Sequence, residues 1–115
     1  MFIILGLLAA ISLNLTKTRA RAYLAVMQSD LRNLGAAQET YFAEHDRYAD
    51  GNTINFTPSA GVTIVNAATG GKGWSARAQH AERTDVWCAV FVGDPSVIFP
   101  PAQVTGVITC GPATP

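Results

Sequence analysis

The sequence predicts an α+β protein in which one long N-terminal helix packs on a small four-stranded antiparallel sheet. Two observations predict the helix. Residues 1–48 contain no proline, and from Leu24 onward apolar side chains recur every three or four positions, which places them on one stripe. A third observation predicts the sheet, because after residue 60 short β-branched and aromatic runs alternate with turn-forming residues. Strands joined by short turns favour an antiparallel meander, and the helix would cover its apolar face.

The first fifteen residues carry no charge and are mostly Ile, Leu, Phe and Ala, a composition that favours lipid or another apolar helix as surroundings. As a helix they would cover about 22 Å of a hydrocarbon core roughly 30 Å thick. The run is therefore a partial span, or partner helices complete it. A cleaved signal peptide is not expected, because the basic residues follow the run. The residues expected to form this membrane and assembly helix are Phe2, Ile3, Ile4, Leu5, Leu7, Leu8, Ile11, Leu13 and Leu15.

Three basic residues, Lys17, Arg19 and Arg21, follow directly after the apolar run. At that position they would mark the membrane boundary and meet anionic headgroups. A solvated helix face would have the same composition. The predicted division of the chain is residues 1–21 as anchor and boundary, 22–48 as the amphipathic helix of the head, and 49–115 as a β head domain.

The amphipathic part of the helix should end near residues 45–47, because residues 46–52 are rich in turn formers and lose the periodic pattern. Its charged residues mostly fall outside the stripe, so this half should lie with its apolar side on something globular. The stripe comprises Leu24, Met27, Leu31, Leu34, Gln38, Tyr41, Phe42 and His45.

Four strands are expected after the helix, at residues 61–68, 74–80, 86–92 and 104–110. In the second, Trp74 and the alternate residues to His80 should face the core, while Ser75, Arg77 and Gln79 face water. The third is almost continuously apolar and should be central, covered on both faces. Gly106 is a possible bulge in the last strand, and residues 111–115 are expected to be a tail.

Cys88 and Cys110 are widely spaced and show no zinc-binding pattern. An even number of cysteines behind a membrane anchor predicts a disulfide in an oxidising compartment, with the head outside the cytoplasm. Two unrelated buried thiols are the alternative. With the head outside the cytoplasm, the basic residues after the anchor would lie on the outer side of the membrane. Basic residues usually lie on the cytoplasmic side, but this tendency is a bias and not a rule.

The composition argues against nucleic acid as a partner, because eight Lys and Arg balance eight Asp and Glu and no basic groove is indicated. No catalytic, cofactor-binding or metal-ligating residue is predicted. Glu44, His45 and Asp46 are adjacent and point in different directions on a helix, His80 belongs to a sheet face, and residues 70–73 lack the Ser or Thr of a phosphate loop. We therefore expect no enzyme and no cofactor.

Several stretches of the helix resemble the type IV pilins and pseudopilins. They are residues 6–11, 17–23, 27–34 and 37–44, followed by Tyr48 and Ala49 after a polar turn and by a cysteine near the C-terminus. The resemblance implies a membrane-anchored structural subunit of a pilus or pseudopilus filament. It also implies an anchor in the bacterial inner membrane and a periplasmic or extracellular head, with copies of the chain and membrane lipid as partners.

The sequence departs from the pilin pattern at its start. The basic leader ending in glycine, the glutamate near the start of the mature anchor and the proline in the anchor are not visible, and Asn14 stands near the place of the proline. Two explanations compete: an upstream start or a fragment, or a pilin-like protein that no longer assembles. The second explanation gives the alternative function, an accessory subunit docked through its helix on a larger membrane complex, respiratory or photosynthetic.

Overall fold

The computed structural model describes residues 2–50, 53–69, 72–93 and 99–112, with side chains described for 19–50, 53–66, 72–93 and 99–112. The helix α1 spans Phe2–His45. The four strands form one antiparallel sheet in the order β1-β2-β3-β4, so the predicted α+β fold is confirmed. The strands are β1 (Val62–Thr69), β2 (Gly73–His80), β3 (Arg83–Val92) and β4 (Thr109–Pro112).

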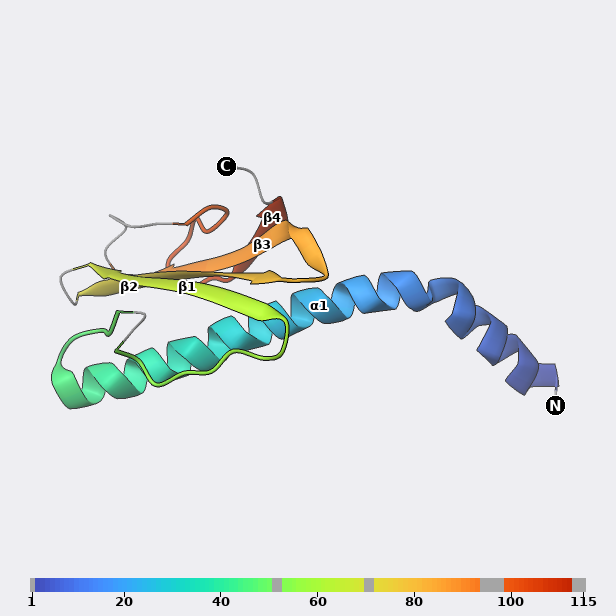
Figure 1. Cartoon of the computed structure of the whole chain (residues 1–115), viewed down its shortest axis with the longest axis horizontal. Coiled ribbons are helices and arrows are strands. Elements are labelled where there is room, and N and C mark those ends of the chain that lie inside the picture. The colour runs from blue at the N-terminus through green and yellow to red at the C-terminus, as the bar shows by residue number, and fades with distance from the viewer. Residues whose placement is uncertain (1, 51–52, 70–71, 94–98, 113–115) are drawn as a thin grey trace.

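The C-terminal half of α1 lies along one face of the sheet, and its N-terminal part projects beyond the sheet (Figure 1). The predicted stripe makes this contact. Met27, Leu31 and Leu34 are each at most 1 % exposed, and they share a core with the inner side chains of β2 and β3. Ala76 and Ala78 supply the part of β2 under the helix, and their small side chains allow a close approach. At the end of the stripe the prediction was wrong, because His45 is exposed.

The helix ends where the sequence predicted. Asp46 takes a left-handed conformation with φ 57°, and its N–H donates to the Phe42 carbonyl at 2.8 Å. A residue in this conformation closes a helix by satisfying a terminal carbonyl, and Asp adopts it more readily than most residues. The following loop then returns along α1 before it enters β1 (Figure 1).

Two strand boundaries in the sheet differ from the predicted ones. β3 begins at Arg83, where a turn was expected, because its first residues are polar and solvent-facing and so lack an apolar pattern. β4 begins at Thr109 and continues into the expected tail. The stretch before it turns at Gly106, which has φ 78°. The exposed Val104 and Val107 flank this turn, so their β-branched side chains misled the prediction.

The outer face of the sheet, away from α1, is less open than predicted. A second small core forms there from Ala89, Phe91 and Ala102, with Phe99 packed against it. Ser75, expected in water, pairs with Phe91 across the sheet and is 1 % exposed. The two cores cover both faces of β3, as the continuous apolar run predicted.

The predicted disulfide is confirmed: Cys88 on β3 and Cys110 on β4 are directly opposite in the sheet register and bonded to each other. The bond ties the short edge strand β4 to β3. We expect the double variant Cys88→Ala, Cys110→Ala to lose about 3 kcal/mol of unfolding free energy, because the bridge closes a loop with a separation of 22 residues. Urea unfolding of the full chain in detergent, followed by near-ultraviolet circular dichroism, measures this. An unchanged midpoint would show that the bridge does not stabilise the head.

Candidate interaction surface

The outward side of α1 consists of small and polar side chains. Between Arg19 and His45 this side has no large exposed hydrophobic residue. The large exposed hydrophobic residues among the described side chains lie outside α1 and are Val65, Val104 and Val107. Small side chains let a second helix approach closely. The exposed small residues, spaced mostly by three, four or seven positions, are Ala22, Ala25, Ser29, Ala36 and Ala43.

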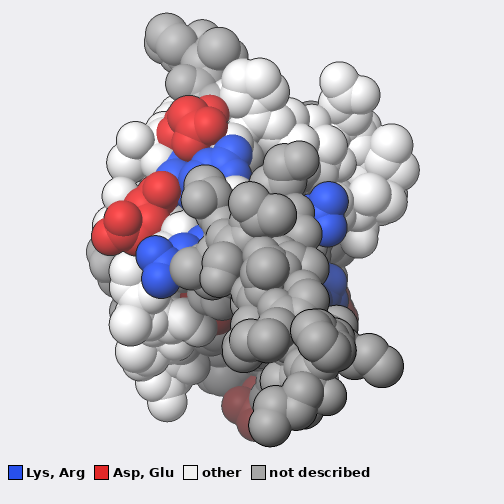
Figure 2. Space-filling model, turned by 90° about the vertical axis from the view of Figure 1, so that its right-hand side faces the viewer, with Lys and Arg blue, Asp and Glu red and all other residues white. Residues whose placement is uncertain are grey.

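The residues predicted to form the membrane and assembly helix, Phe2 to Leu15, lie outside the described side chains, as does Lys17. Arg19 and Arg21 are described and both are exposed. Figure 2 views this end of the molecule, and on the visible described surface blue and red side chains lie near one another without a large patch of one sign. In the part of the chain that the structure describes, no helix has the length and apolarity needed to cross a membrane. The boundary role of the basic residues stays a prediction, as does the division of the chain at residues 21 and 48.

A buried carboxylate attaches the returning loop to the middle of α1. Asp30 is 4 % exposed and accepts two hydrogen bonds from Ser59, one from its backbone N–H and one from its hydroxyl, both at 2.8 Å. Two donors on one residue satisfy both carboxylate oxygens, which burial requires. Asp30 thus positions the loop just before β1.

A buried amide attaches the start of the same loop. Gln38 is fully buried, and its Nε2 donates to the Ala49 carbonyl at 2.7 Å while its Oε1 accepts from the Ala49 N–H at 2.9 Å. This pair imitates the two bonds that neighbouring strands exchange. The sequence marked Gln38 only as a residue filling the apolar stripe. Its partner is backbone, so no side-chain pattern could have revealed the contact.

The Tyr48 ring fixes the other side of this loop near the C-terminal end of α1. It packs on Phe42 with the ring centroids 4.7 Å apart, and its hydroxyl donates to a Glu39 carboxylate oxygen at 3.1 Å. Burial, followed by the hydrogen bond to Glu39 and its negative charge, raises the pKa of Tyr48 above the usual 10.0. The loop surface beside α1 is therefore ordered by polar and aromatic contacts.

A groove of about 250 Å³ runs between α1 and the β3–β4 side of the sheet. Its floor is apolar and its rim carries one charge of each sign, Arg32 and Glu39. The exposed Val104 and Val107 flank Gly106 at its edge. The groove can accept an apolar side chain of a neighbouring molecule. The lining residues are Leu31, Arg32, Gly35, Glu39, Trp74, Val90, Val92, Gly106 and Ile108.

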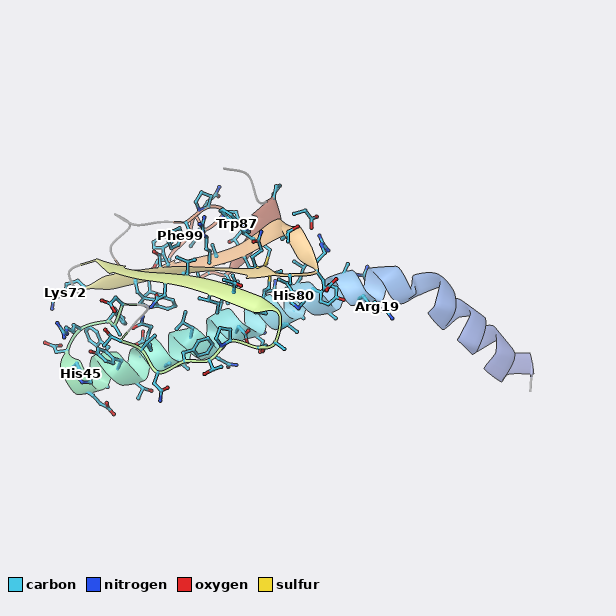
Figure 3. All side chains as sticks on the ribbon, in the orientation of Figure 1. Arg19, His45, Lys72, His80, Trp87 and Phe99 are labelled. Carbon is cyan, nitrogen blue, oxygen red and sulfur yellow. A yellow bond between two sulfur atoms is a disulfide. The ribbon has the colours of Figure 1, made fainter. Side chains whose placement is uncertain are left out.

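His80 serves packing, as its place in the strand pattern predicted. It is 8 % exposed, lies against Tyr23 with the ring centroids 4.4 Å apart and accepts the Glu82 N–H at Nδ1, at the place labelled in Figure 3. Gly61, at φ 82°, leaves room for the ring, since a Cβ there would lie 2.9 Å from it. Glu44, His45 and Asp46 are exposed, and the described residues contain no group of three possible ligands that could hold a metal ion.

A known protein is similar to this chain and supports the resemblance seen in the sequence. The chain is 42 % identical over 72 residues to the type IV major pilin protein PilA of Myxococcus xanthus (strain DK1622), a match covering 58 % of the chain. Over these residues the chain is similar to a type IV major pilin. It spans about a third of the length of this pilin, since the match covers 33 % of it. No family model matches the chain, and no solved structure matches it. The α1 helix packed on an antiparallel sheet fits the same assignment.

We expect Gln38→Leu to destabilise the folded chain by about 1–3 kcal/mol, because the buried Ala49 N–H would lose its partner. The Ala49 carbonyl would keep a hydrogen bond from Asn66 at 3.3 Å, which limits the loss. Thr40→Ala, an exposed position two residues along α1, is the matched control and should change stability by less than about 0.5 kcal/mol. Urea unfolding of both variants measures the difference. Equal midpoints would contradict a structural role for the amide.

The Tyr48 contact predicts a loss of stability in alkali. Because the folded-state pKa of Tyr48 lies above its usual 10.0, its contribution is fully present below pH 10 and is lost as the pH rises through the folded pKa. Glu39→Gln should lower the pKa of Tyr48 part of the way, since the charge is removed but burial, the largest cause, remains. Ultraviolet titration of phenolate measures it, with Tyr48→Phe assigning the signal. An identical titration curve for Glu39→Gln and the wild type would rule out the contribution of Glu39.

Proposed function

We propose that this chain is a subunit of a type IV pilus-like filament, in which α1 packs against the α1 helices of other copies and the sheet lies on the outside. The observation that supports this most directly is the similarity to a major pilin in a chain whose helix projects beyond its sheet. The role is structural, since assembly would use the helix surface and no chemical step.

The two ends of α1 would contribute differently to the filament. In the projecting part, burial of apolar side chains from residues 2–15 would drive association with about 25 cal/mol for each Å² removed from water. Along the head, the small outward residues of α1 would let neighbouring helices approach to about 8–10 Å. The basic residues Lys17, Arg19 and Arg21 would lie between these regions, near the headgroups of the inner membrane before assembly. The head would then be periplasmic, or at the cell surface in the filament.

The alternative is an accessory subunit that uses the same helix once, on a larger membrane complex. Both functions leave the sheet outside, so the fold does not separate them. Electron micrographs of material sheared from cells distinguish the two functions. Fibres that react with an antibody to this chain would support the filament. Purification from detergent at a fixed ratio with other proteins, without fibres, would overturn it and favour the accessory role.

The helix packing is tested by Ala25→Arg and Ala25→Ser. Ala25 is exposed on the outward side of α1, so an arginine there should prevent close helix packing and abolish fibres, whereas serine should leave their number unchanged. Both changes face away from the sheet, so both variants should form the Cys88–Cys110 bond, as thiol labelling would show. Normal fibres from Ala25→Arg would contradict a helix bundle built on this face.

A further inference from the structure

We propose that Arg77, held against Trp87 and Phe99 on the outer face of the sheet, forms a binding site for a carboxylate. Figure 3 labels the two aromatic residues on the side of the sheet opposite α1. Arg77 lies on β2, Trp87 lies on β3, and Phe99 belongs to the segment that packs over this face. Three separate parts of the chain therefore converge on one guanidinium group.

The distances show that the guanidinium is fixed in place. Its central carbon Cζ lies 3.8 Å from the centre of the Trp87 ring and 4.9 Å from that of Phe99. Both separations fall within the range of cation–π attraction. Arg77 is half-buried, so the aromatic rings restrict its rotamers before any ligand arrives. Less conformational entropy is then lost on binding.

The same guanidinium lacks an anionic partner among the described residues. The ion pair found among the described residues joins Arg83 to Asp85 at 3.0 Å. The Asp85 carboxylate, two positions before Trp87 on β3, is therefore already paired with another arginine. The Ser75 hydroxyl, two positions before Arg77 on the same face, is buried and makes no hydrogen bond in the described part of the chain. A guanidinium has five N–H donors, and no hydrogen bond from those of Arg77 to a described residue is found.

The chemistry of the group selects the ligand. Aromatic rings take no hydrogen bond of ordinary strength from the guanidinium, so its N–H donors remain for recognition of a ligand. A planar edge with two parallel donors matches the two oxygens of a carboxylate. The two neighbouring rings lower the local polarity and so strengthen the charge-assisted bonds. The class of ligand is therefore an exposed carboxylate carried by another molecule.

The location of Arg77 indicates the side from which a ligand would reach it. In the filament proposed above, α1 faces the bundle and the outer face of the sheet points away from it, so the site stays open after assembly. This accessibility rests on the proposed function, whereas the site itself needs only the folded head. The carboxylate would thus belong to a ligand outside the filament and not to the packed helices.

The test is a nuclear magnetic resonance titration of the full unassembled chain in detergent with sodium acetate, against sodium chloride at equal ionic strength. We expect saturable shifts of the Trp87 indole N–H and the Arg77 Nε–H, with a dissociation constant on the order of 1 mM. The Trp74 indole, buried under the other face, is the internal reference and should not shift. Since no fibres are involved, failure here is distinct from failure of the filament proposal.

Arg77→Lys keeps the positive charge and removes the planar fork, so it should weaken acetate binding at least about tenfold. Arg47→Lys, at an exposed position just after the end of α1, should leave binding unchanged. Unchanged binding in Arg77→Lys, equal shifts with chloride, or no saturable shift in the wild type would overturn the site. Tighter binding of inorganic phosphate than of acetate would overturn the carboxylate assignment. The wild-type titration decides the matter alone if Arg77→Lys does not fold.

Discussion

The contact between α1 and the inner face of the sheet is the constraint on which the rest of the structure depends. Met27, Leu31 and Leu34 are buried at helical spacing against a sheet whose strand β2 offers two alanines, Ala76 and Ala78, at this place. A large side chain in those positions of β2 would lift the helix from the sheet and open the core. Because this contact uses only one side of the C-terminal half, the outward side and the projecting part of α1 remain available to partners.

The loop between α1 and β1 depends on this contact in turn. The described part of this loop contains no helix or strand. Two buried side chains of α1, Asp30 and Gln38, nevertheless attach it to the helix by hydrogen bonds. A buried polar side chain is favourable only when its partners are in place, so the position of the loop and the burial of Asp30 and Gln38 require one another.

The predictions from sequence succeeded where local pattern and tertiary packing agree. The helix stripe, the end of α1 near Asp46 and the first two strands follow from periodicity and turn chemistry alone. The errors lie where contacts between residues far apart in the sequence determine the structure. The pairing of Cys110 with Cys88 places β4 later in the chain than the β-branched residues before it suggested. Ser75 on β2 was expected in water, yet it is buried and pairs with Phe91, which packs with Phe99 and Ala102. Arg77 gave no signal either, because its aromatic partners are ten or more positions away in the sequence.

The two faces of the sheet separate the two proposed activities of the chain. Assembly would use α1, and recognition of a carboxylate would use Arg77 on the opposite side of β2. A substitution at Arg77 changes no residue of the helix core, and one at Ala25 changes no residue near Trp87. The filament and the ligand site are therefore expected to fail or succeed independently, which makes each separately testable.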